Sequence, residues 1–246
     1  MKLNNSYVLY SNQQLPYADS NGRTLLPLRL IGDVVGAAVS WSAKEQKASV
    51  TMGADNISII LNEKIALVNG QKKQMDTVAV VKNSTIMVPA RFIAEEFKIK
   101  ITFDKITNVV HLDDPRILSA ERINRIDEME RVDDNFNGEI IPLEFSFFKD
   151  VKNSVKNRIN VNLQNYSSQA IKKDQLNRNI IFFVSNSKLA FIGTRGMIAP
   201  DGSTGVNSIN IKANSIYNDE IYIESLKNDE GEAFRYIFGN YFITTS

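Results

Sequence analysis

The chain has 246 residues, which is enough for one large domain or two ordinary ones, each with a core of its own. It carries 29 Lys and Arg against 28 Asp and Glu, so the formal net charge of +1 provides no overall field that attracts nucleic acid or an anionic membrane. Cysteine is absent, which excludes disulfides, thiolate nucleophiles and metal sites with sulfur ligands.

The N-terminal segment has no targeting signal that the sequence makes visible. Residues 1–7, Met-Lys-Leu-Asn-Asn-Ser-Tyr, contain no apolar region of the kind that a signal peptide needs, and no other stretch is long enough to span a bilayer. We therefore expect no membrane insertion. The chain either lost a signal peptide during processing or reaches its site by another route.

A repeated unit occupies the first half of the sequence. Residues 21–31 align with residues 83–93 at a constant shift of 62 positions, and the alignment continues through residues 39–42 and 101–104. A repeat of this kind indicates a duplicated structural unit. In each copy a turn leads into a short apolar strand, and a proline then stands where a helix can begin.

The remainder of each copy predicts a β-hairpin. In the first copy, Gly36 stands where a left-handed helix end is favoured, and apolar residues alternate with polar ones around a turn at residues 43–45. The second copy repeats this alternation around residues 105–107. Between the copies, residues 59–70 predict a further hairpin, and we match it with residues 8–12 near the start of the chain.

The first copy contains the segment Arg23-Thr24-Leu25-Leu26-Pro27-Leu28-Arg29-Leu30-Ile31-Gly32-Asp33-Val34-Val35-Gly36-Ala37, followed by Val39-Ser40-Trp41-Ser42. This pattern resembles the copper amine oxidase N-terminal-like domain, or stalk domain, over about residues 5–112. That family is common in surface and secreted proteins of low-GC Gram-positive bacteria, and the resemblance implies an accessory module without enzyme activity. Copper is not expected, because copper sites use mainly imidazole or sulfur ligands and the chain has one histidine, His111.

Several side chains of the repeat have both a structural and a functional interpretation. Arg29 and Arg91 lie in the first turn of their predicted helices, where the helix dipole disfavours a cation, so we expect internal pairs rather than a ligand clamp. Trp41 is either a carbohydrate anchor or a core residue, and its equivalence with Phe103 favours the core. His111 is interpreted as a structural or surface residue.

The pattern changes after the repeat. Residues 114–138 combine apolar residues near helical spacing with many charges, which predicts an exposed helical connector. This connector separates a duplicated module at residues 1–113 from a second domain at residues 139–246.

Residues 133–144, Asp-Asp-Asn-Phe-Asn-Gly-Glu-Ile-Ile-Pro-Leu-Glu, satisfy the spacing of an EF-hand calcium loop. The expected calcium ligands are Asp133, Asn135, Asn137, Glu139 and Glu144. A second interpretation stays open. Leu143, Phe145 and Phe147 alternate with polar residues, so the segment also fits the first strand of the next domain after a plain turn.

Short strands separated by polar turns fill the rest of the chain and predict an antiparallel β-sandwich of immunoglobulin-like type. The fold class is therefore mainly β with short helices, and the N-terminal repeats are α+β. The glycine-containing segments at residues 193–196 and 201–205 precede no predicted helix. We interpret them as exposed, partner-contacting loops rather than phosphate sites.

Three functions from different classes fit these patterns. The first is a non-catalytic structural or adhesive component of an extracellular assembly, on a bacterial cell surface or in a phage-like particle, with other protein subunits or cell-wall components as partners. The second is a calcium-dependent binding protein. The third is a carbohydrate-active enzyme with paired carboxylates, although no pair of acids stands out from the background.

Overall fold

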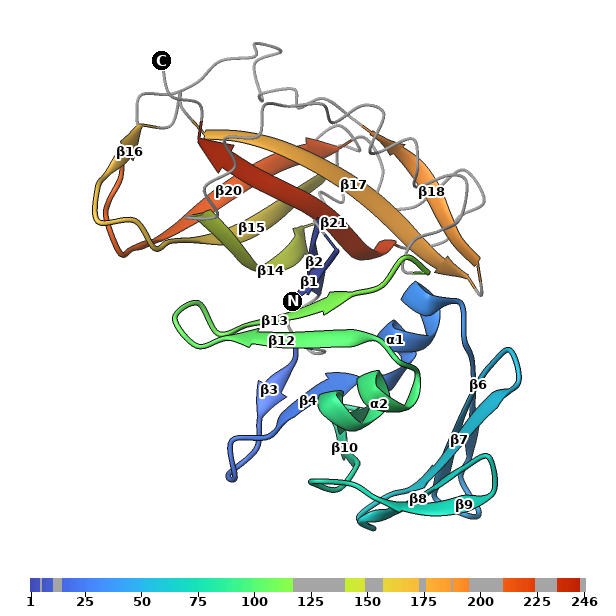
Figure 1. The fold of residues 1–246 in the computed structure, drawn as a ribbon. Helices are drawn as coiled ribbons and strands as arrows, with labels where there is room; N and C mark the ends of the chain where they lie inside the picture. Colours follow the sequence, from blue (N-terminus) through green and yellow to red (C-terminus); the bar gives the residue numbers. More distant parts are fainter. Residues whose placement is uncertain are drawn as a thin grey trace. The chain divides into compact units, whose positions relative to one another are not determined.

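The computed structural model describes residues 1–4, 6–10, 15–116, 140–148, 157–172, 176–186, 188–194, 210–223 and 234–243. The chain divides into two compact units. The N-terminal unit comprises residues 1–4 and 13–119, and the C-terminal unit comprises residues 5–12 and 120–246. The described residues are mainly β with two short helices, so the predicted fold class is confirmed (Figure 1).

The duplication is visible as the same succession of elements in both halves of the N-terminal unit. The elements of the first copy are β4 (Thr24–Pro27), α1 (Leu28–Val35), β5 (Ala38–Ser42) and β6 (Lys47–Met52). Those of the second copy are β11 (Thr85–Pro89), α2 (Ala90–Glu96), β12 (Lys100–Asp104) and β13 (Val109–Asp113). Each helix begins directly after its proline, as predicted, with the proline itself in extended conformation.

The two helices end in the same way although their last residues differ. Gly36 follows α1 with a φ of 71°, the left-handed conformation predicted for it. Lys98, its equivalent in the second copy, also has a positive φ, 57°. Glycine adopts this conformation freely, whereas a residue with a Cβ atom is strained in it. The fold therefore imposes the same turn on both copies.

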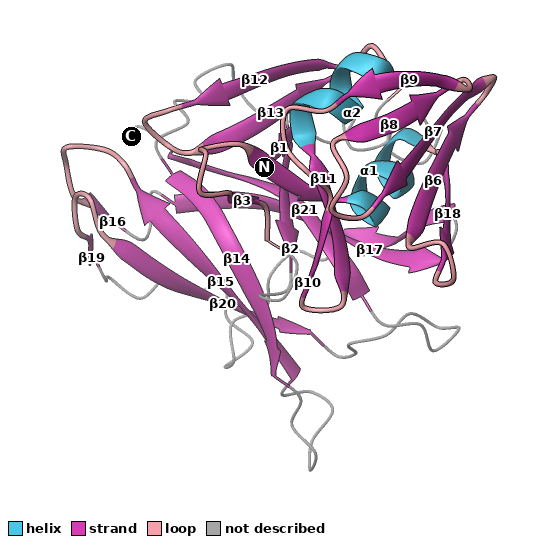
Figure 2. Ribbon diagram, turned by 90° about the horizontal axis from the view of Figure 1, so that it is seen from below, coloured by secondary structure: helices cyan, strands magenta, loops and turns pink. Residues whose placement is uncertain are grey.

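The copies join through equivalent strands. Strand β4 pairs antiparallel with β11, and Leu26 lies opposite Val88, which is its own equivalent under the shift of 62 positions. Antiparallel pairing about such a point relates the two copies by a local two-fold axis. Strands β3 (Tyr17–Ala18) and β10 (Val80–Lys82) extend the sheet on either side, and both helices contact β4 and β11 (Figure 2).

The hairpin of each copy pairs with further strands. In the first copy the order is β5-β6-β7-β8-β9, with β7 (Asp55–Ile60), β8 (Ile65–Val68) and β9 (Gln71–Gln74) antiparallel to their neighbours. The hairpin predicted within residues 59–70 is thus confirmed. In the second copy β1 (Lys2–Leu3) pairs with β13 and runs parallel to it. It occupies the place beside β13 that β7 has beside β6.

The described strands of the C-terminal unit pair antiparallel, as predicted. One sheet has the order β14 (Ile140–Phe148), β15 (Asn157–Asn165) and β20 (Ile216–Ile223). The other strands that pair in this unit are β2 (Ser6–Tyr10), β21 (Phe234–Ile243), β17 (Leu176–Asn186) and β18 (Lys188–Thr194), with the short pair β16 (Ile171–Lys172) and β19 (Asn210–Ile211). Strand β14 contacts both β2 and β21, so the two sheets pack together. The immunoglobulin-like arrangement stays a prediction.

Strand β2 corrects one expectation. We matched residues 8–12 with the hairpin between the copies, but β2 pairs antiparallel with β21 of the C-terminal unit. Tyr7, Val8 and Leu9 are consecutive and all buried. Because successive side chains of a strand point to opposite faces, β2 is covered on both faces. Apolar alternation predicts a strand, but it does not predict which strand will pair with it.

Candidate functional site

The two arginines that begin the helices are surface residues. We expected Arg29 and Arg91 to form internal pairs, and this expectation is wrong. Both side chains are exposed, and neither forms an ion pair with any residue that the structure describes. The buried face of each helix points elsewhere, since Leu28 and Leu30 on either side of Arg29 are in the core. The duplication therefore presents two equivalent exposed cations.

The two equivalent aromatic residues are also more open than we expected. Trp41 is 40% exposed and Phe103 is 49% exposed, so the prediction that they belong to the core is wrong. Trp41 lies opposite Ala48, which is fully buried, so the ring is on the inner face of its sheet. Phe103 likewise lies opposite buried Val110. Among the described strands β5 and β12 are at the edges of their sheets, and this leaves the outer part of each ring in solvent.

His111 has a structural environment. Its Nε2 atom lies 2.7 Å from the main-chain oxygen of Asn4, and its neighbours across the sheet are Lys2 and Thr102. The interaction fixes the chain where it leaves β1. With one imidazole in the whole sequence and no cysteine, the donor set does not fit a copper site.

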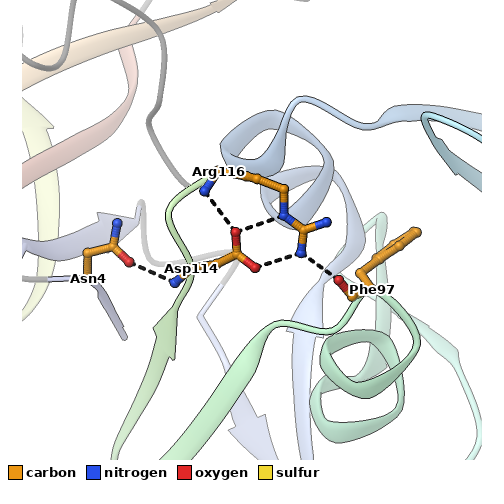
Figure 3. Close-up of polar contacts among 4 residues, drawn as sticks. All are labelled: Asn4, Phe97, Asp114 and Arg116. Carbon is orange, nitrogen blue, oxygen red and sulfur yellow. Dashed lines mark hydrogen bonds and ion pairs between the residues drawn. The ribbon is translucent and has the colours of Figure 1, made fainter.

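A polar cluster around the buried carboxylate of Asp114 closes the C-terminal end of the N-terminal unit (Figure 3). The carboxylate of Asp114 accepts hydrogen bonds from the main-chain N–H and the side chain of Arg116, with distances of 2.6 to 2.8 Å. The same guanidinium donates to the carbonyl of Phe97 at the end of α2, and the N–H of Asp114 donates to Asn4. One pair thus ties three segments of the unit together.

The signal for this cluster in the sequence is weak. An Asp-Pro dipeptide after the last strand indicates a turn, but the contacts with Asn4 and Phe97 join residues distant in sequence. Hydrogen bonds from Arg116 hold the pKa of the Asp114 carboxyl below its usual range. The pair is ionised at neutral pH and acts as a clasp rather than as an acid or a base.

The predicted calcium loop lies mostly outside the described residues. Asp133, Asn135, Asn137 and Glu139 belong to that undescribed part, whereas Glu144 is in β14. There its Oε1 atom accepts a hydrogen bond of 2.8 Å from the amide of Asn162. Residues 140–148 form a strand, in agreement with the alternating pattern. Calcium binding itself stays a prediction.

A polar surface continues from Glu144 across the outer face of the same sheet. The amide of Asn218 donates to Asn162, which in turn donates to Glu144, so the three side chains form a ladder over β14, β15 and β20. Arg158 lies beside them, 3.1 Å from Glu220 and over the ring of Phe148. These groups satisfy one another, which is typical of a solvated sheet face.

The clusters in the described residues do not supply a catalytic constellation. Within the described part of the chain, no three His, Cys, Asp or Glu side chains gather as a metal site would require. Residues 195, 196 and 201–205 of the predicted exposed loops lie outside that part, and Gly193 and Thr194 end β18. No helix in the described residues is long and apolar enough to cross a membrane.

The duplicated unit, with its paired strands, corresponds to a known family. Residues 2–112 match the family described as the copper amine oxidase N-terminal domain. This segment is a copper amine oxidase N-terminal domain. The match agrees with the resemblance over about residues 5–112, and the N-terminal domain of this family is non-catalytic. No curated protein matches the chain.

The copper amine oxidase N-terminal domain is not identical with the N-terminal unit of the structure. The match is continuous from residue 2, but residues 5–12 within it belong to the C-terminal unit. The domain therefore contributes one strand, β2, to the fold of the second half of the chain. His111 and both exposed aromatic rings lie within the matched segment.

Proposed function

We propose that this chain is a non-catalytic structural or binding subunit of an extracellular assembly, either at a cell surface or in a phage-like particle. The observation that carries the proposal is the family match, because the copper amine oxidase N-terminal domain is non-catalytic and compatible with a structural or binding role. A module without catalytic groups acts through its surface.

The surface of the duplicated module supports this role. Trp41 and Phe103 expose apolar ring area at equivalent positions, and Arg29 and Arg91 expose equivalent cations. Aromatic residues and arginine are the side chains most enriched at protein interfaces and at their energetic centres. The copies pair about a local two-fold axis, so each copy offers the same surface chemistry to a partner. Other protein subunits are the first class of partner, and cell-wall components are the second.

The experiment measures assembly and wall binding on the full chain. Light scattering over a range of concentrations, with negative-stain microscopy, reports rings, fibres or symmetric oligomers. Sedimentation with isolated peptidoglycan reports wall binding. Trp41→Ala and Phe103→Ala each remove one exposed ring, and Ile65→Ala is the matched control because Ile65 is 42% exposed.

Loss of assembly or sedimentation in the aromatic variants, with Ile65→Ala unchanged, supports the proposal. A chain that stays monomeric at every concentration and does not sediment with peptidoglycan contradicts it. Equal behaviour of all three variants in a chain that does assemble shows that the aromatic positions are not the contact.

A further inference from the structure

We propose that strand β2 is exchangeable between copies of this chain: it completes the C-terminal unit of its own chain in the monomer and that of a second copy in an assembly. The inference rests on the proposed assembly function and names its partner as a second copy of the same chain.

The first observation is the connectivity. The chain contributes residues 1–4 to the N-terminal unit, residues 5–12 to the C-terminal unit, and residues 13–119 to the N-terminal unit again. Asn4 is fixed by its contacts with His111 and Asp114, and β3 is fixed by its pairing with β4. Strand β2 is therefore a segment of one unit held between two anchored parts of the other.

The second observation is the extensive pairing and burial of β2 within the C-terminal unit. Tyr7, Val8, Leu9 and Tyr10 pair in continuous antiparallel register with residues 236–239 of β21, and β2 also contacts β14. The first three side chains are buried. Without β2, β21 has an unpaired edge on the side away from β17. Such an edge pairs readily with a strand from another chain.

A second copy can pair with this edge of β21 because it carries the identical strand. Exchange preserves every pairing of β2 and changes only the chain to which the strand belongs, which is why exchange of identical elements is a low-cost route to oligomers. The other covalent link between the units, residues 117–139, spans at most about 80 Å when fully extended. The link is thus long enough for the two units of one chain to pair with different copies.

The expected kinetics follow from the burial of β2. The strand must separate from β21 of its own chain before β2 of another copy can pair there, and this separation exposes three buried side chains. Exchange is therefore slow in native buffer and fast when chains refold together at high concentration. Once formed, the exchanged assembly dissociates slowly for the same reason.

The absence of cysteine in the chain makes a direct test simple. Val8 lies opposite Phe238. Opposite residues on antiparallel strands have Cα atoms about 4.5–5.5 Å apart, within the range that a disulfide bridges. The double variant Val8→Cys/Phe238→Cys first shows that the bond closes within one folded chain. The two single variants, one with an affinity tag, are then mixed, refolded together at high concentration and oxidised.

A disulfide-linked pair of one Val8→Cys chain and one Phe238→Cys chain is the expected product, identified by mass spectrometry of the linked peptides. The control mixes Leu9→Cys with Phe238→Cys, because Leu9 lies opposite Ile237 and its side chain points to the other face. We expect at least a tenfold lower yield from this control. Equal yields from both mixtures indicate random collision and overturn the proposal.

Assembly of the unmodified chain separates this inference from the proposed function. If the chain forms oligomers by light scattering but the mixed single variants give no cross-link although the double variant closes, strand exchange is refuted and the assembly function stands on another surface. A mixed cross-link that appears only in the oligomeric fraction supports both.

Discussion

Leu3 and Leu9 are six positions apart, both are completely buried, and the structure assigns them to different units. Leu3 lies opposite Leu112 of the N-terminal unit, and Leu9 lies opposite Ile237 of the C-terminal unit. Leu3→Ala and Leu9→Ala are therefore chemically identical changes with different structural targets. Each serves as the control for the other.

Truncation of a fully buried leucine to alanine costs about 2–5 kcal/mol, through lost burial and the cavity that remains. A loss of about 3 kcal/mol increases the population of the opened state more than a hundredfold, since each 1.4 kcal/mol is a factor of ten. Hydrogen exchange read by mass spectrometry measures this opening segment by segment. Leu3→Ala should accelerate exchange in β12 and β13, and Leu9→Ala in β17 and β21.

The result that would refute the reasoning is specific. If Leu9→Ala accelerated exchange in β4 and β11 and left β17 and β21 protected, residues 5–12 would belong to the N-terminal unit. Equal acceleration of all segments by both variants would mean that the two units unfold together.

Three further outcomes are expected. Lys98→Gly should stabilise the N-terminal unit by up to about 1 kcal/mol, whereas Gly36→Ala should destabilise it by about 1 kcal/mol, because both positions have a positive φ. A Cβ atom at Gly36 meets nothing within 4 Å, so the expected cost comes from the backbone conformation and not from a clash. Urea unfolding measures both changes in stability, and changes of the opposite signs would contradict the argument. The Asp114 carboxyl has a lowered pKa in the folded chain, so its stabilisation is present above the ordinary aspartate pKa of about 3.9 and is lost as the pH falls below it. Asp114→Asn should reduce the loss of stability between neutral and acidic pH, and an unchanged pH profile would count against the clasp. Calcium should release or absorb heat and raise the melting temperature if residues 133–144 bind it, and Asp133→Ala should abolish both effects; a titration without heat or shift excludes the site.

The sequence predicted the repeat well because the residues that begin and end its helices and turns act locally. Proline before each helix, Gly36 after the first, and turns between alternating apolar residues act within a few positions and are read directly. Lys98 shows the limit of that reading. Lysine is not a residue that predicts a left-handed conformation, and only the repeat places it where Gly36 stands in the first copy.

The predictions that were wrong depend on which element lies next to which in space. Trp41 alternates correctly for an inner face, but its exposure is decided by the position of β5 at the edge of the sheet. The expected pairing of Arg29 and Arg91 was wrong for the same reason, since both side chains are exposed and no residue that the structure describes forms an ion pair with either. The Asp114–Arg116 clasp also depends on distant residues, Asn4 and Phe97.

The first ten residues connect these observations. In the first copy of the repeat, the free edge of β6 pairs with β7 from the same copy, whereas the equivalent edge of β13 in the second copy pairs with β1. The following strand, β2, pairs with the edge of β21 in the C-terminal unit. One short segment therefore protects two strand edges that would otherwise be exposed, one in each unit. Unprotected edges of this kind pair with other chains. The duplicated module is thus completed by β1, which precedes both of its copies, and the C-terminal unit takes its strand β2 from the same short segment.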